Sequence, residues 1–115
     1  MVKMIIAGGR DFDNYDNLVK VLDKLPKPKE IVSGKARGAD SLGEVYALDH
    51  GITVAEFPAD WDKFGKSAGH VRNQQMADYA DILVAFWDGE SKGTKSMIKK
   101  MNALYKPALV CLYDN

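Results

Sequence analysis

Short apolar runs alternate with longer segments of helical period along this chain, and this alternation constrains the fold more than any other feature. The runs predict five strands, at Val2–Ala7, Glu30–Ser33, Thr53–Phe57, Ile82–Trp87 and Ala108–Tyr113. Most are continuously apolar, as in strands covered on both faces. Strands that alternate with helices are typical of βα units around a parallel sheet, so we expect an α/β fold of Rossmann type.

The segments between the strands carry helical apolar stripes. The first stripe, which ends before Pro26, consists of Leu18, Val21, Leu22 and Leu25, at i, i+3, i+4 and i+7. Further helices are predicted at about Ala39–Asp49 and Ser67–Ala80, and a last one on Met97, Ile98, Met101, Leu104 and Tyr105. We interpret the two methionines as core residues. The helix at Ser67–Ala80 has a weak apolar stripe and a polar first turn, so we expect the first turn to face a polar site. We expect Tyr79, near its end, to be exposed and to fit a symmetric contact between subunits.

Length, charge and cysteine content narrow the class of protein. A chain of 115 residues suits one domain, residues 1–115, with its own core. Sixteen basic residues balance 16 acidic ones, and no basic stripe is evident, which disfavours binding to nucleic acid or an anionic membrane. The lone Cys111 excludes an intrachain disulfide and is expected to be a buried, inert thiol in a reducing compartment. No apolar run is long enough to span a membrane, so we expect a cytoplasmic protein.

Glycine-rich turns follow three of the predicted strands, and ligands of open α/β sheets bind at these strand ends. The turns are Gly8-Gly9-Arg10-Asp11, Ser33-Gly34-Lys35-Ala36-Arg37-Gly38-Ala39-Asp40 and Trp87-Asp88-Gly89-Glu90-Ser91-Lys92-Gly93-Thr94. Each leads towards a helix N-terminus, where backbone N–H groups can contact phosphate. The GxGxxG fingerprint and the GxxxxGK[ST] loop are both absent, which disfavours dinucleotide binding of that type and P-loop ATP hydrolysis.

Two arginines are the main candidates for binding the anion, because a guanidinium offers a bidentate fork. They are Arg10 and Arg72; the alternatives are surface ion pairs of Arg10 with Asp11 or Asp13, and of Arg72 with Asp78. Trp61, Phe64 or Trp87 could stack on a base, and we favour Trp87. Pro58–Lys66, the longest irregular stretch, is a candidate functional loop.

Other polar residues admit both a structural and a functional interpretation. Asp40 and Asp88 either cap helices or contact a ribose. His70, near a helix start, more commonly hydrogen-bonds than catalyses. No Cys/His/Asp cluster has metal-ligand spacing, so we expect neither a metal nor a cofactor.

These turns, together with Pro58-Ala59-Asp60-Trp61 and Arg72-Asn73, resemble the SLOG superfamily, which includes the Lonely-guy phosphoribohydrolases and the DNA-processing proteins of bacterial competence. Within it the chain is most similar to the small YspA-like family of bacteria and phages. The resemblance covers nearly the whole chain and implies a three-layer sandwich around a five-stranded parallel sheet of order 3-2-1-4-5. It also implies a pocket for a nucleotide or a derivative such as an ADP-ribose-like ligand, and a homo-oligomer.

The resemblance leaves catalysis open. The Lonely-guy enzymes carry a PGGxGTxxE motif; Gly93 and Thr94 match its glycine and threonine, and Arg72 matches the family's arginine, but Met97 stands at the position of the acid. A thioether cannot stabilise an oxocarbenium-like charge. We therefore expect a binding module, a sensor or sequestering protein. The alternative is a nucleoside 5'-monophosphate N-glycosidase in which Glu90 or Asp88 replaces the acid beside Arg72, and single-stranded nucleic-acid binding is the least favoured function.

The ligand-binding residues expected on these grounds are Gly8, Gly9, Arg10, Asp11, Ser33, Gly34, Ala36, Gly38, Ala39, Asp40, Trp61, Arg72, Asn73, Trp87, Asp88, Ser91, Gly93 and Thr94.

Overall fold

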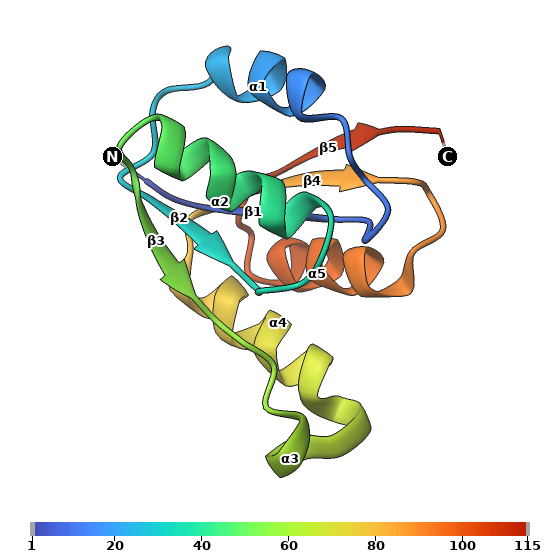
Figure 1. Ribbon diagram of the computed structural model, residues 1–115. Helices are drawn as coiled ribbons and strands as arrows, with labels where there is room; N and C mark the ends of the chain where they lie inside the picture. The colour runs from blue at the N-terminus through green and yellow to red at the C-terminus, as the bar shows by residue number, and fades with distance from the viewer. Residues whose placement is uncertain (1, 115) are drawn as a thin grey trace.

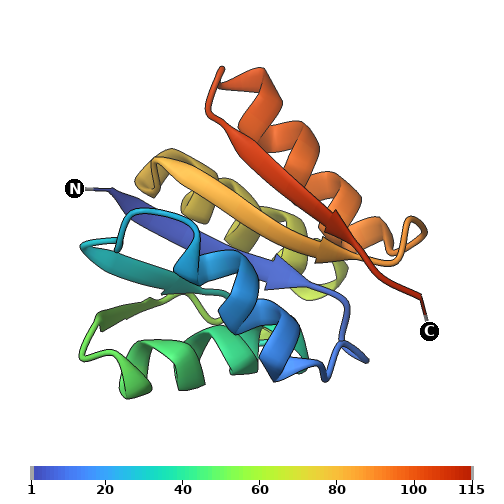
Figure 2. The ribbon, with the colours of Figure 1, turned by 90° about the horizontal axis from the view of Figure 1, so that it is seen from above.

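A sheet of five parallel strands lies between two layers of helices in the computed structural model, which describes residues 2–114 (Figure 1). The strands are β1 (Lys3–Gly8), β2 (Glu30–Ser33), β3 (Thr53–Glu56), β4 (Ile82–Trp87) and β5 (Ala108–Leu112). Their order is β3-β2-β1-β4-β5, and Figure 2 shows it from β3 in green to β5 in red. The predicted α/β fold and its strand order are confirmed.

Alternate residues of each central strand enter two separate cores, which explains why these strands are continuously apolar. On one face Met4, Ile6, Val84 and Phe86 pack with α1 (Tyr15–Asp23) and α2 (Ala39–Asp49). On the other face Ile5, Ala7, Leu83 and Ala85 pack with α4 (Ala68–Tyr79) and α5 (Lys92–Ala103). Met97 and Met101 are 1% and 0% exposed, so their predicted place in the core is confirmed.

Several element bounds differ from the prediction. β1 begins at Lys3 and includes Gly8, because Gly8 pairs with Phe86 of β4. The last helix begins at Lys92, before its predicted apolar stripe, and ends at Ala103. Leu104 and Tyr105, predicted to belong to the stripe, follow the helix, because Tyr105 has a positive φ of 57°. α2 has the predicted bounds.

The stretch predicted as an irregular loop, Pro58–Lys66, contains the short helix α3 (Trp61–Phe64), followed by a 3-10 turn at Gly65–Ser67. Asp60 caps α3 by accepting a 3.0 Å hydrogen bond from the N–H of Lys63. This segment projects from the body of the molecule below α4 (Figure 1). Aspartate is a preferred N-cap residue, so Asp60 was the local signal for this helix start.

Cys111 is half-buried rather than fully buried, because it lies on an edge strand, and burial raises the pKa of its thiol. No helix within residues 2–114 has the length and apolar character needed to cross a membrane.

Candidate functional site

A cavity of about 480 Å³ lies at the carboxyl ends of β1 and β4. The chain leaves β1 towards β2 on one side, whereas β4 and β5 lie on the other, so this is the topological switch point of the sheet. Open α/β sheets bind their ligands at such a point, and the volume falls within the usual range for small-molecule sites.

Residues from all three predicted turns and from α4 meet around this cavity. Of the predicted site residues, Gly8, Gly9, Arg10, Asp11, Ala36, Asp40, Arg72, Asn73, Asp88, Ser91, Gly93 and Thr94 line it. The lining also includes Ala7, Met76 and Met97, which were not predicted. Their positions in the sequence could have indicated two of them, because Ala7 precedes the first glycine turn and Met76 lies one helical turn beyond Arg72.

The other predicted residues do not line this cavity. They are Ser33, Gly34, Gly38, Ala39, Trp61, Trp87 and the catalytic candidate Glu90. Ser33 donates a 2.6 Å hydrogen bond to Glu44, and the indole of Trp87 donates one of 3.0 Å to the carbonyl of Ser91. Trp87 therefore braces the loop before α5 and does not form the expected wall for a base.

Gly34 and Trp61 instead line a neighbouring hollow of about 280 Å³, which shares Arg10, Ala36 and Arg72 with the main cavity. Trp61 is 54% exposed, so its ring is available to a group that extends past the two arginines. The aromatic residue best placed to stack on such a group is thus Trp61 and not Trp87.

The turn after β1 is joined directly to the start of α2. The carbonyl of Gly9 accepts hydrogen bonds from the N–H groups of Ala39, at 3.2 Å, and Phe12, at 3.3 Å. Gly38 has φ +79°, and a Cβ there would lie 2.1 Å from the Gly9 carbonyl oxygen. The N–H of Ala39, expected to face phosphate, is therefore engaged within the protein.

The start of α5 is arranged differently. Its N-cap residue, Ser91, makes no side-chain capping hydrogen bond, and Gly93 and Thr94 of its first turn line the cavity. The N–H groups of a first helical turn have no partner within the helix, and they attract anions. Of the two helix starts at the cavity, that of α5 is the one suited to an anion.

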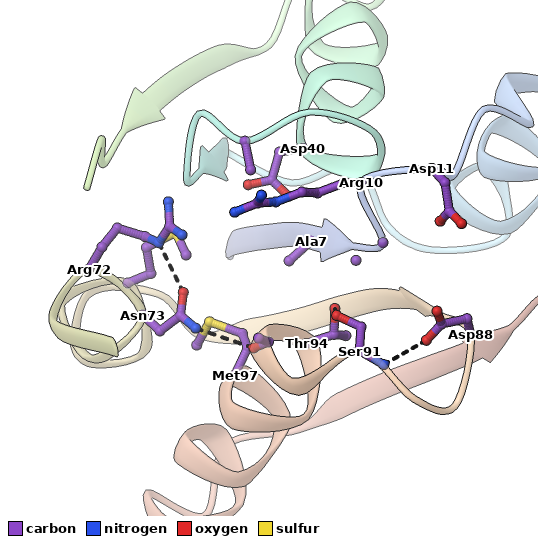
Figure 3. A pocket seen from close by; sticks show the side chains of 15 residues that line it. Ala7, Arg10, Asp11, Asp40, Arg72, Asn73, Asp88, Ser91, Thr94 and Met97 are labelled. Atoms are coloured by element: carbon purple, nitrogen blue, oxygen red, sulfur yellow. Dashed lines mark hydrogen bonds between the residues drawn. The ribbon is translucent and has the colours of Figure 1, made fainter. Parts of the chain in front are cut away.

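Asp88 organises the loop that leads to this helix. Its Oδ1 accepts 2.8 Å hydrogen bonds from the N–H groups of Glu90 and Ser91, and Figure 3 draws the second of these. This is an Asx turn, so the prediction that Asp88 caps the helix is wrong: the N-cap is Ser91.

Arg72 and Asp40 form the polar wall opposite α5 (Figure 3). The guanidinium of Arg72 donates from Nη1 to the Gly34 carbonyl and from Nε, at 2.9 Å, to Oδ1 of Asn73. Arg72 is thus directed into the site and does not pair with Asp78, which accepts from Gln74 instead. The carboxylate of Asp40 accepts a 3.1 Å hydrogen bond from the N–H of Gly34, and the N-cap of α2 is Gly38, so Asp40 is not a helix cap.

Burial controls the protonation of this pair. Asp40 is only 5% exposed, and desolvation raises the pKa of its carboxyl to about 6, although Arg72 and backbone N–H groups act in the opposite direction. Burial also lowers the pKa of Arg72, and the nearby charge of Arg10 adds to that effect. A buried carboxyl that titrates near neutrality can hold or release a proton.

Arg10 is exposed and points across the cavity (Figure 3). Among residues 2–114 the ion pairs involve Lys35 and His50 rather than Arg10, and Oδ1 of Asp11 accepts a 2.6 Å hydrogen bond from Tyr113. The predicted alternative of an Arg10–Asp11 ion pair is therefore not formed.

His70 lies outside the cavity, with Nδ1 3.2 Å from Oγ of Ser96. Met97, on the cavity floor, is 1% exposed and brings no titratable group. Within the described residues no group of three His, Cys, Asp or Glu side chains is placed to hold a metal ion.

The fold and the cavity define a Rossmann-like α/β protein with a polar site at its switch point. A family model for the YspA, cpYpsA-related SLOG family (YAcAr) matches residues 2–64, and the chain belongs to this family. It is also 32% identical over 110 residues to the Gene 61 protein of Mycobacterium phage D29, covering 87% of this chain and 88% of that protein. No solved structure matches the chain. Membership of a SLOG family points to nucleotide-related binding or processing.

Proposed function

We propose that the protein binds a phosphate- and ribose-bearing nucleotide, or a nucleotide derivative such as ADP-ribose, at the switch point of the sheet, as a sensor or sequestering protein. The observation that carries the proposal is the meeting of two arginines, Arg10 and Arg72, with the first turn of α5 around one cavity. Guanidinium groups and helical N–H groups both prefer phosphate oxygens.

The remaining lining suits a ribose. Asp40 and Asp88 both line the cavity and supply carboxylate oxygens that accept hydrogen bonds from hydroxyl groups, and Ser91 lies between Asp88 and the phosphate end. In this arrangement the phosphate lies between Arg10, Arg72 and Gly93. The second hollow, with Trp61, takes the part of the ligand beyond the arginines.

A cytoplasmic location and a homo-oligomeric state complete the proposal. Nucleic acid is not the proposed ligand, because the chain carries equal numbers of basic and acidic residues.

The test combines binding and product analysis in the same samples. Purified protein is incubated with nucleoside monophosphates, cyclic nucleotides and ADP-ribose; thermal unfolding reports binding, and chromatography reports the products. A ligand at 100 times its dissociation constant adds about 2.7 kcal/mol to the free energy of unfolding, which corresponds to roughly 10 °C in Tm. Stabilisation by a ligand recovered intact supports the proposal, and no stabilisation by any of them contradicts it.

Matched variants locate the binding. Arg10→Ala removes an exposed guanidinium from the cavity and should weaken binding about tenfold to a hundredfold, since a charge-assisted hydrogen bond contributes about 1.5–3 kcal/mol. Lys20→Ala removes an exposed charge from α1, away from the cavity, and should leave binding unchanged. Equal effects of the two variants would exclude the proposed site.

One observation favours an N-glycosidase as the second candidate. Asp40 has a pKa of about 6, lies in the cavity and is coupled to Arg72, so it could supply the proton transfer that Met97 cannot. This function predicts release of free base and ribose 5-phosphate from a nucleoside monophosphate. Asp40→Asn should then abolish product formation while binding persists.

A further inference from the structure

β5 is an edge strand without the usual protection of an edge. Its one neighbour in the sheet is β4, and no charged residue occurs from Ala108 to Tyr113. Edge strands of soluble proteins commonly carry a lysine, a bulge or a proline within the strand, because an open apolar edge pairs with other chains. Here Pro107 precedes the strand and leaves all five of its residues able to pair.

The hydrogen bonds to β4 show which backbone groups of β5 face outwards. The carbonyl of Pro107 accepts from the N–H of Leu83, and the N–H of Tyr113 donates to the carbonyl of Trp87, both at 3.0 Å. In a β-strand, the N–H and C=O groups of one residue point to the same side of the strand, and those of the next residue point to the opposite side. Odd-numbered residues of β5 therefore face β4, and Ala108, Val110 and Leu112 direct their N–H and C=O groups away from the sheet.

The side chains at this edge are exposed and apolar. Leu109 is 40% exposed, Val110 36% and Leu112 70%. Tyr105, just before the strand, is 97% exposed. Pairing of β5 with another strand would remove this apolar surface from water on both faces of the sheet.

We propose that two copies of this chain associate through antiparallel pairing of β5 with β5, around a two-fold axis at Val110. Val110 then exchanges both backbone hydrogen bonds with Val110 of the second copy, and Ala108 exchanges both with Leu112 of that copy. This register is self-complementary: every outward N–H and C=O group of the strand finds a partner under the symmetry. The two sheets become one continuous sheet.

The charges beside the strand agree with this register. The paired segments carry no charge that would repel its symmetry mate, and Lys106 lies opposite Asp114 of the second copy. Two donors of the Lys106 ammonium are used by the carbonyls of Ala77 and Asp78, at 2.7 and 3.1 Å, which leaves a third for this contact.

The opposite edge of the sheet is less suited to pairing. β3 is four residues long and ends with Glu56, whose carboxylate forms a 3.0 Å ion pair with Lys35. β5 offers five residues to the pair, whereas a standard stable interface involves roughly 20–30 residues and about 800 Å² per partner, so we expect a reversible dimer that dissociates on dilution.

Cysteine cross-linking tests the register. In a Cys111→Ala background, Val110→Cys places two thiols opposite each other across the axis, about 5.5 Å apart between Cα atoms, within the range for a disulfide. Leu112→Cys is the matched control, because its partner in this register is Ala108. Under mild oxidation the Val110→Cys chain should migrate as a covalent dimer and the Leu112→Cys chain as a monomer. Equal cross-linking of the two, or of neither, would overturn the proposal.

Sedimentation of the unmodified chain over a concentration series, compared with Val110→Pro, tests the association itself. The N–H of Val110 points outwards, so proline there removes a hydrogen bond of the dimer and none of the monomer. The unmodified chain should dimerise with rising concentration, and Val110→Pro should stay monomeric with an unchanged circular dichroism spectrum. A monomeric unmodified chain, or a Val110→Pro chain that still dimerises, contradicts the proposal. Neither experiment depends on the proposed ligand.

Discussion

The carboxylate of Asp40, in the first turn of α2, accepts a 3.1 Å hydrogen bond from the backbone N–H of Gly34, which follows β2. Arg72, on α4, donates to the carbonyl of the same glycine. Gly34, in the loop after β2, thus contacts both Asp40 and Arg72, and its two backbone groups orient a carboxylate and a guanidinium.

The first prediction concerns this glycine. A Cβ at Gly34 would lie 2.7 Å from Nη1 of Arg72 and 2.9 Å from Oδ2 of Asp40. We expect Gly34→Ala to displace Arg72 and to weaken ligand binding by more than tenfold, with a smaller effect on folding because the arginine can move. Thermal shifts with and without ligand measure the two effects. Gly51→Ala is the comparison for binding, since Gly51 lies outside the cavity and a Cβ there has no atom within 4 Å. If Gly34→Ala bound the ligand with unchanged affinity, the position of Arg72 would not matter for ligand binding.

The second prediction is a pH dependence of stability that arises from Asp40. Its carboxyl has a pKa of about 6 in the folded protein, against an ordinary value of 3.8 for an aspartate, so the folded state binds the proton more tightly. The resulting stabilisation is present below about pH 4 and is lost as pH rises through about 6, by on the order of 3 kcal/mol. Asp40→Asn should remove this contribution. From pH 4 to pH 7 the free energy of unfolding of the unmodified chain should therefore fall relative to that of Asp40→Asn. Urea unfolding across this range measures it, and parallel curves would contradict the assignment.

The third prediction compares two glycines of positive φ. Gly38 has φ +79° and no space for a Cβ, whereas Gly51 has φ +65° and no atom within 4 Å of one. Gly51→Ala should cost about 1 kcal/mol from the left-handed backbone alone. Gly38→Ala should cost several kcal/mol or prevent folding, because it also separates the Gly9 carbonyl from α2. Urea unfolding measures the free energy of unfolding of both variants. Equal losses would mean that the backbone at Gly9 can move away from a Cβ at position 38 without cost.

The fourth prediction concerns Met97, which stands where the resemblance to the Lonely-guy motif would place an acid. Met97 is 1% exposed, so Met97→Glu buries a carboxyl group among apolar side chains and should lower stability by several kcal/mol at pH 7. The loss should shrink at pH 5, where the buried carboxyl is protonated. Met97→Leu conserves volume and should cost less than about 1.5 kcal/mol. A stable Met97→Glu at neutral pH would show that water reaches this part of the cavity floor.

Local sequence signals were sufficient for the scaffold. Gly38 and Gly51 flank α2 and allowed both of its bounds to be predicted. The meeting of the glycine turns followed from the fold, because the carboxyl ends of parallel strands share one edge. Twelve of the predicted ligand-binding residues therefore line the cavity.

Local sequence patterns did not predict the contacts between elements that are distant in the sequence. Asp40 has the pattern of a helix-start residue, and its actual role depends on Gly34 and on burial. Trp87 ends an apolar strand beside the site, but its indole turns to the Ser91 carbonyl. Both outcomes depend on which side chains the fold brings together, and no spacing along the chain encodes that.

The cavity is built from both halves of the chain, with β1 beside β4 at the centre of the sheet. The projecting α3 segment is the covalent link between those halves. A protease that cut there would leave two fragments still joined by the β1–β4 ladder, whose five residue pairs run from Met4 and Ile82 to Gly8 and Phe86. The fold is thus suited to division at α3 into two complementary pieces, neither of which contains a complete binding site until the two reassociate.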